Sequence, residues 1–281
     1  MRQAINARRG GRAMHAEEAL KQGDLKAALA DLTDRIRRAP ADARLRIFLF
    51  QLFAVLGAWD RALAQLQVAG ELDAGALAMV NTYRELLRAE ALRAKVFTGD
   101  LDPLILGEPT AWIALLIAAL RASAQGRFEA SKQLRDQGLE EAPVIPGRID
   151  GAAFGWIADA DSRLGPLLEI LIDGRYAWVP FQRIRTLILE EPKDLRDLVW
   201  LPARVTWSNG GETVAFIPTR YPGSEASPDG RIRLARLTDW VDLGAGCYRG
   251  LGQRMLTTDT GDHALLASRR IDLGPVPTES R

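Results

Sequence analysis

The sequence predicts an α+β protein in which an array of paired helices is followed by a small, mainly antiparallel β domain. Two observations support this prediction. From Met14 to about Ala142, leucines and other apolar residues recur at the spacing of one helix face. Beyond Pro143 and Pro146, glycine, tryptophan and β-branched residues become more frequent, and turn sequences separate short apolar runs.

A turn recurs along the helical half. Residues 22–29 have the same form as residues 56–63, and a third copy covers residues 125–130. Each copy has a glycine at the turn, a large residue two positions later, and then alanine. Gly23 and Gly57 are 34 positions apart. Glycine can end the first helix of a pair in a left-handed conformation, and the small alanine lets the second helix pack closely.

This pattern is similar to the tetratricopeptide repeat, whose period is about 34 residues. One helix pair cannot bury its apolar face alone, so we expect the pairs to stack. The array is degenerate, because the repeat due near residue 91 lacks its glycine and residues 99–103 look like an inserted loop. We predict a disordered basic leader over residues 1–13, a tetratricopeptide-like helical domain over 14–145 and a β-rich domain over 147–281. Met14 is an alternative start to Met1.

Hairpin signals dominate the second half. Asp173-Gly174 separates the apolar runs 167–172 and 176–180, which predicts a β-hairpin. A second hairpin is expected from residues 203–207 and 214–218 around Asn209-Gly210. Residues 187–189 fit another strand, although 183–188 could begin as a short helix. The segment 195–201 is ambiguous.

Charge and cysteine content limit the possible partners. Lysine plus arginine number 37 and aspartate plus glutamate number 36, so no overall field attracts nucleic acid or an anionic membrane. The longest uninterrupted apolar run, 112–120, is far shorter than the ~20 residues of a membrane span. The single Cys247 excludes an internal disulfide and fits a reducing compartment. We expect a cytoplasmic protein that has protein partners and no cofactor, and that inserts into no membrane.

Few residues suggest catalysis. His15 and His263 stand outside any metal-ligand pattern, so both are interpreted as surface residues. A nucleophilic pair of Cys247 and His263 is conceivable in space, but no motif supports it. The glycine-rich stretch 244–252 lacks the lysine and serine or threonine that close a phosphate-binding loop, so a tight exposed turn is favoured.

Two residue groups leave alternatives open. Asp159, Asp161 and Asp173 could hold a divalent cation, but turn-capping carboxylates or an internal Asp–Arg pair explain them more simply. Tryptophan is dense for one small domain. Most of these side chains should anchor the core, and one or two at the surface would mark a binding patch; they are Trp156, Trp178, Trp200, Trp207 and Trp240.

A series of motifs in the second half is distinctive. In order, these are 159–166 with Glu169, 173–180, 192–198, 200–203, 216–224, 239–240 and 250–256. Their order resembles the ImpE family, also called TagJ or SciE-type proteins, which are accessory components of type VI secretion systems. The resemblance covers nearly the whole chain beyond residue 13. Its motif residues are Asp159, Asp161, Arg163, Pro166, Glu169, Gly174, Tyr176, Trp178, Pro180, Pro218, Arg220, Tyr221, Asp239, Trp240, Gly252, Gln253 and Arg254.

The resemblance implies a cytoplasmic, virulence-associated, non-enzymatic adaptor beside the contractile sheath. Family members are expected to bind the N-terminal helix of the small, TssB-type sheath subunit and to be linked to the ClpV-type disassembly ATPase. A helical array offers a groove for such a helix. Candidate contacts are Arg44, Phe48, Gln51, Tyr83 and Trp112, although core packing explains Phe48 and Trp112 better. The alternatives are a self-associating scaffold and, less favoured, a metal-dependent enzyme in the β domain.

Overall fold

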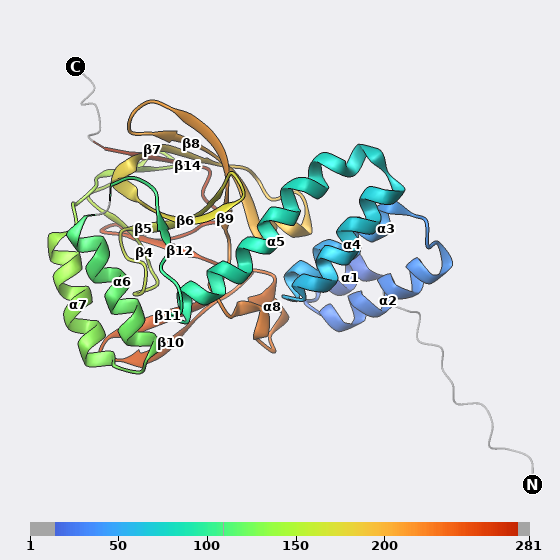
Figure 1. Cartoon of the computed structure of the whole chain (residues 1–281), viewed down its shortest axis with the longest axis horizontal. Helices are drawn as coiled ribbons and strands as arrows, with labels where there is room; N and C mark the ends of the chain where they lie inside the picture. The colour runs from blue at the N-terminus through green and yellow to red at the C-terminus, as the bar shows by residue number, and fades with distance from the viewer. Residues whose placement is uncertain (1–14, 109, 275–281) are drawn as a thin grey trace, which may run out of the picture.

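The computed structural model describes residues 15–108 and 110–274 (Figure 1). The predicted leader and the choice between Met1 and Met14 lie outside these residues. The α+β class is confirmed. The helices are α1 (Ala16–Lys21), α2 (Leu25–Arg38), α3 (Ala43–Val55), α4 (Trp59–Leu72), α5 (Leu77–Phe97), α6 (Ala111–Ala124), α7 (Phe128–Glu141) and the short α8 (Gly230–Arg233), with 3-10 turns η1 (Ala74–Ala76), η2 (Phe181–Arg183), η3 (Leu195–Leu198) and η4 (Ser224–Ala226).

The strands form three sheets. The largest has the order β1-β6-β5-β9-β8-β7-β14-β2-β3, and only its β1–β6 pair is parallel. Its strands are β1 (Leu104–Ile105), β2 (Gly147–Ile149), β3 (Ala152–Phe154), β5 (Leu167–Ile172), β6 (Arg175–Pro180), β7 (Ile184–Leu189), β8 (Trp200–Trp207), β9 (Glu212–Pro218) and β14 (Arg270–Leu273). The smaller sheets are β10 (Thr238–Gly244) with β11 (Cys247–Gly252), and β13 (Gly261–Ala264) with β12 (Met255–Thr258) and β4 (Ile157–Asp159).

The predicted turns have the expected backbone. Gly23, Gly57 and Gly126 have φ of 77°, 68° and 73°, the left-handed conformation that ends a helix without a steric penalty only at glycine. They join α1 to α2, α3 to α4, and α6 to α7. In the β half, Asp173 and Gly174 (φ 49° and 71°) form the tight turn between β5 and β6.

The three helix pairs do not form one continuous stack. Helix α5 has 21 residues and a length of about 32 Å, and it runs through position 91 without a break. The α1–α4 group lies around one end of α5, whereas α6 and α7 lie beside the sheet at the other end (Figure 1). The expectation that the third pair stacks on the first two is therefore wrong. Where the repeat lacks its glycine, a single long helix replaces a helix pair.

The two ambiguous segments each begin with a single helical turn. Residues 181–183 form η2, and β7 follows from Ile184, so the strand expected over 187–189 is present and starts earlier. Residues 195–198 form η3, and β8 follows from Trp200. The second predicted hairpin is β8–β9, in which Ala203 pairs with Ala215.

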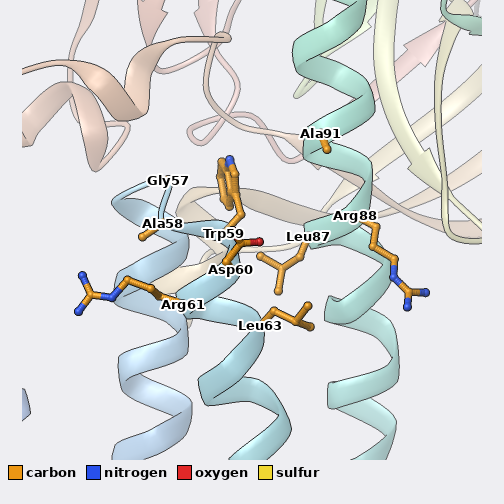
Figure 2. A pocket seen from close by; sticks show the side chains of 9 residues that line it. All are labelled: Gly57, Ala58, Trp59, Asp60, Arg61, Leu63, Leu87, Arg88 and Ala91. Atoms are coloured by element: carbon orange, nitrogen blue, oxygen red, sulfur yellow. The ribbon is translucent and has the colours of Figure 1, made fainter.

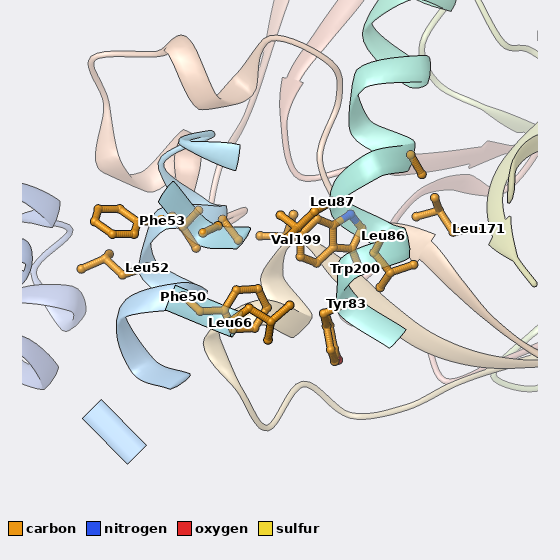
Figure 3. Close-up of a cluster of buried hydrophobic side chains, with 14 of the residues drawn as sticks. Phe50, Leu52, Phe53, Leu66, Tyr83, Leu86, Leu87, Leu171, Val199 and Trp200 are labelled. Atoms are coloured by element: carbon orange, nitrogen blue, oxygen red, sulfur yellow. The ribbon is translucent and has the colours of Figure 1, made fainter. Parts of the chain in front are cut away.

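Helices and sheet share one hydrophobic core (Figure 3). Alternate residues of β5 and β6 point to opposite faces. Leu167, Leu171, Tyr176 and Trp178 join the cluster formed with α1–α6, whereas their neighbours along each strand join a second cluster inside the β half. Trp200 lies among side chains of α3, α4 and α5 (Figure 3). Residues from both sides of position 146 in the sequence belong to the same apolar cluster. The domain boundary expected at this position stays a prediction.

The turn glycines allow a matched test. Gly57 packs on η4, and a Cβ there would lie 2.6 Å from Glu225 Cβ, whereas a Cβ at Gly126 meets nothing within 4 Å. We expect Gly126→Ala to lower the free energy of unfolding by about 1 kcal/mol through left-handed strain alone. Gly57→Ala should cost roughly 2–3 kcal/mol because overpacking adds to the strain. Urea unfolding followed by circular dichroism measures both, and equal losses would contradict the packing of this turn on η4.

Candidate functional site

A groove opens between α4 and α5, beside the turn that ends α3 (Figure 2). Its volume is about 570 Å³, and it is lined by Gly57, Ala58, Trp59, Asp60, Arg61, Leu63, Leu87, Arg88 and Ala91. Leu63 and Leu87 point toward each other across it, whereas Arg61 and Arg88 point outward on either side (Figure 2). An apolar floor with charged edges is a surface that the apolar face of an amphipathic helix can cover.

Trp59 connects the groove wall to the interior. Its ring centroid lies 6.0 Å from that of Trp200, which is fully buried. The indole Nε1 of Trp200 donates a hydrogen bond of 2.8 Å to Glu90 Oε1 on α5. The position of the groove wall therefore depends on packing that continues into a buried charged cluster.

Glu169 of β5 lies at the centre of that cluster. Arg93 of α5 donates to it twice, from Nε to Oε1 at 2.7 Å and from Nη2 to Oε2 at 2.9 Å. The Tyr176 hydroxyl donates to Oε1 at 2.6 Å and accepts a 2.6 Å hydrogen bond from Trp178 Nε1. All four side chains are buried. Arg93 and Glu169 meet because both lie on the faces that α5 and the sheet turn toward each other.

Arg254, between β11 and β12, approaches the cluster from the other side. Its guanidinium pairs with both Glu169 and Asp159, and its Nε donates to the Pro218 carbonyl at 2.9 Å. Arg254 has no exposed surface. Arg93 also pairs with Glu90 one turn earlier on α5, at 3.4 Å. We call these five charged residues, Glu90, Arg93, Asp159, Glu169 and Arg254, the buried ion cluster.

Burial and pairing shift two carboxyl pKa values in opposite directions. Burial favours the neutral form of Glu169, but Arg93 and Arg254 outweigh burial and lower its pKa to about 2. For Asp159 burial dominates, and together with the nearby charges of Asp161 and Glu169 it outweighs Arg254 and raises the pKa to about 6. Glu169 therefore stays ionised near neutral pH, whereas Asp159 titrates in the mildly acidic range.

Two arginines of the C-terminal half cap helices of the N-terminal half. Arg220, which is buried, donates to the last carbonyl groups of α3, those of Val55 at 2.7 Å and Ala54 at 3.2 Å. Arg236 donates to the carbonyl groups at the end of α1, those of Leu20 at 2.7 Å and Lys21 at 3.0 Å. A cation at a helix C-terminus satisfies carbonyls that have no partner within the helix and complements the helix dipole. The α1–α2 and α3–α4 pairs are thereby both held against the β half.

Known proteins are similar to this chain in sequence and in fold. The family described as ImpE protein matches residues 151–272. The type VI secretion system accessory component TagJ of Pseudomonas aeruginosa strain PAO1 is 52% identical over 266 residues, which cover 95% of this chain and 93% of that protein. This chain belongs to the ImpE family. The crystal structure of protein VPA1032 from Vibrio parahaemolyticus is similar with a TM-score of 0.85 at 25% identity, over 94% of this chain and 99% of that one.

The buried ion cluster joins residues of the motifs predicted from the sequence to the helical half. Asp159, Glu169 and Arg254 belong to the motifs, and so do Tyr176 and Trp178, which complete the hydrogen-bond chain. Sequence reasoning missed the α5 members Glu90 and Arg93. A signal was present: they are charged residues three positions apart on the apolar face of a helix, and such residues are seldom buried unless paired.

Other motif residues support the backbone around the cluster. Asp161 forms the Asp–Arg pair with Arg163 through an Nε–Oδ1 contact of 2.8 Å and also accepts the Gly250 N–H at 3.0 Å. The Tyr221 hydroxyl exchanges hydrogen bonds with the Met255 backbone at 2.9 and 3.1 Å. The contacts of Asp161 tie the loop before β5 to β11, and those of Tyr221 tie the segment after β9 to β12.

The structure does not gather the predicted partner contacts into one exposed surface. Arg44 is exposed and Phe48 half-buried, but the exposed fractions are only 7%, 6% and 5% for Gln51, Tyr83 and Trp112. Gln51 accepts a hydrogen bond from the backbone N–H of Arg196 in η3. Tyr83 packs against Phe50, Trp200 and Phe216. The reason is that η3 and the sheet cover the α3–α5 face that a free helical array would leave open. The open groove lies instead between α4 and α5.

The residues considered for catalysis lie apart. Asp159 and Asp161 face arginines, and Asp173 lies in the β5–β6 turn. Within residues 15–108 and 110–274, no three His, Cys, Asp or Glu side chains form a group that could hold a metal ion. Cys247 is buried at the start of β11, whereas His263 lies in β13 of another sheet. In the stretch 244–252, the tight turn is limited to Ala245 and Gly246, and β11 begins at Cys247.

The tryptophans divide between core and surface. Trp178 and Trp200 have no exposed surface, and Trp207 is half-buried. Trp156 and Trp240 are 40% and 39% exposed, so the β half presents two tryptophans at its surface. In the part of the chain that the structure describes, no helix is both long and apolar enough to span a membrane.

Arg254 should be far more important for stability than a surface arginine in a similar pair. Arg254→Met would leave Asp159 buried without its cation and Glu169 with Arg93 alone, and we expect it to lower the free energy of unfolding by about 3–5 kcal/mol. The control is Arg270→Met, which breaks an exposed pair with Asp272 and should cost much less. Chemical unfolding compares the two variants. Similar losses would mean that the buried ion cluster does not organise the fold.

Asp159 should give stability a distinctive pH dependence. Its pKa rises from 3.8 in the unfolded chain to about 6 in the folded protein, so between these values the folded state binds more protons. The contribution of Asp159 to stability is complete below about pH 4 and is lost as the pH rises through about 6, by about 3 kcal/mol.

Asp159→Asn removes this titration. We therefore expect the wild type to lose stability relative to this variant as the pH rises from 4 to 7, when urea unfolding is measured at each pH. A stability difference that stays constant across this range would show that Asp159 titrates normally.

Proposed function

We propose that this chain is a cytoplasmic accessory component of a type VI secretion system and acts as a non-enzymatic adaptor. The support is its 52% identity to TagJ, which is described as a type VI secretion system accessory component. In this proposal the chain binds the N-terminal helix of the small, TssB-type sheath subunit and links the sheath to the ClpV-type ATPase. The β half fixes the position of the helices and carries out no reaction.

The observation that carries the proposal is the α4–α5 groove. Its walls are two helical segments that lie side by side and run in opposite chain directions, and apolar Leu63 and Leu87 converge between them (Figure 2). A third helix laid into such a groove buries residues at positions i, i+3, i+4 and i+7. Arg61 and Arg88 flank the opening and favour a helix with acidic residues beside its apolar stripe.

The groove is held ready before binding. Trp59 is fixed against Trp200, and the turn at Gly57 is fixed against η4. A binding site whose walls do not have to reorganise loses less conformational entropy when a partner binds. This supports a recognition role for the groove.

A charge placed in the groove should weaken helix binding. Ala91 is exposed and lines the groove, so Ala91→Glu adds bulk and a negative charge there without disturbing the core. Ala78→Glu, at an exposed position of α5 outside the groove, is the matched control. The measurement is isothermal titration with a synthetic peptide of the N-terminal helix of the small sheath subunit from the same organism.

We expect saturable binding to the wild type and to the Ala78→Glu variant, and at least tenfold weaker binding to the Ala91→Glu variant. Scrambling the apolar stripe of the peptide should also abolish binding. If the peptide gives no saturable heat, that helix is not the ligand. If the two variants bind equally, the helix binds elsewhere on the chain.

A further inference from the structure

A second groove lies beside α7 and β4. Both elements belong to the sheet side of the molecule (Figure 1). Its volume is about 560 Å³, and its walls come from α7, the segment 142–146 and the motif stretch around β4. The proposed adaptor function does not use this groove. Three features of its walls indicate what it can bind.

The first feature is an exposed apolar surface. Val144 is 72% exposed, Leu139 43% and Trp156 40%, and all three line the groove. Large apolar side chains usually avoid water, and several of them exposed around one hollow are typical of an interaction site. Trp156 is also one of the two tryptophans that the β half presents at its surface.

The second feature is the edge of a sheet. Strand β4 is the outer strand of the sheet β13-β12-β4 and pairs with β12 on one side. On its other side, the N–H of Asp159 donates to the Gly165 carbonyl at 2.7 Å, but no described strand pairs with Ile157 there. The backbone of Ala158 faces β12. An open edge of this kind can accept the backbone of an extended peptide.

The third feature is an unmatched positive charge. Arg135 of α7 lines the groove and is only 7% exposed. Its Nη1 has no hydrogen-bond partner among the described residues, and its Nη2 makes only long contacts, at 3.3 and 3.4 Å, with the carbonyl groups of Ala245 and Gly246. The nearby acids are already engaged, since Asp136 pairs with Lys132 and Asp159 pairs with Arg254. A buried guanidinium without an anion favours the arrival of a carboxylate.

We propose that this groove binds an extended, strand-like peptide segment of a partner protein, with apolar side chains on either side of one acidic residue. The peptide backbone adds to the edge of β4 at Ile157, its apolar side chains cover Val144 and Trp156, and its carboxylate pairs with Arg135. This site is separate from the α4–α5 groove and takes a ligand of different secondary structure.

The test starts from a display library of random heptapeptides selected on the full-length protein. Enriched peptides are synthesised with a fluorescein label, each beside a counterpart in which Asp or Glu is replaced by Asn or Gln. Fluorescence polarisation measures their affinity for the wild type and for Val144→Ser and Arg135→Gln variants. Val214→Ser is the control, because Val214 is 68% exposed on β9 and is not among the groove residues.

We expect an enriched class of peptides with an acid between apolar residues. Their affinity should fall at least tenfold with Val144→Ser and remain unchanged with Val214→Ser. The loss on amide substitution of the peptide should be at least tenfold with the wild type and should vanish with Arg135→Gln, because the two changes remove the same ion pair.

The proposal fails if no peptide is enriched, or if the enriched peptides bind the Val144→Ser variant as tightly as the wild type. It also fails if the acid and amide peptides bind the wild type equally. Val144 lies at the surface, and the comparison of acid with amide peptides uses the wild type. Both tests therefore remain informative even if Arg135→Gln weakens the fold.

Discussion

Glu169 is an ionised carboxylate with no exposed surface, held between the guanidinium groups of Arg93 and Arg254. Removing such charges from water costs several kcal/mol each, and the cost is offset only when every partner is in place. The three residues come from α5, from β5 and from the segment between β11 and β12. The cluster therefore permits one orientation of α5 on the sheet and penalises others, which is a contribution to specificity more than to net stability.

The fixed orientation of α5 determines where the helical pairs can lie. Helix α4 packs on α5, and Trp59 at the start of α4 contacts Trp200, which is hydrogen-bonded to Glu90. The α1–α2 and α3–α4 pairs are held at their turn ends by Arg236 and Arg220 of the C-terminal half. The helical array is thus part of one structure with the sheet, and the α4–α5 groove is the opening that this packing leaves.

Features set by local chemistry could be predicted from the sequence. The helix-ending glycines and the Asp173-Gly174 turn depend on backbone conformations that neighbouring residues determine, and each lies where expected. Features set by contacts between distant parts of the chain could not be predicted in this way. Gln51 and Tyr83 looked available on α3 and α5 because the η3 segment that covers them is more than 100 positions away. The displaced α6–α7 pair follows from α5 continuing unbroken, and a missing glycine alone did not reveal this.

The acidic motif illustrates the same limit at the candidate site. Asp159 and Asp161 are compatible with a cation site as long as only their spacing is known. The structure supplies cations from the chain itself. Arg163 pairs with Asp161, two positions before it, and Arg254 pairs with Asp159, which is 95 positions away. Local sequence can suggest the first partner but not the second. Glu90 and Arg93 had a local signal, charge on an apolar helix face, but their partner Glu169 could not be inferred from it.

The buried ion cluster also borders both proposed binding sites. Trp59 of the α4–α5 groove is linked to it through Trp200 and Glu90, and Asp159 lines the groove beside α7. Coupling between two sites requires an element with two alternative arrangements whose balance both ligands shift. Above about pH 6, where Asp159 is ionised, every charge in the cluster is paired, and breaking any pair leaves a buried charge without a partner, so no second arrangement of similar energy is available. Such a connection is rigid. It is suited to holding two partners at a fixed separation, so that binding in one groove leaves the affinity of the other unchanged.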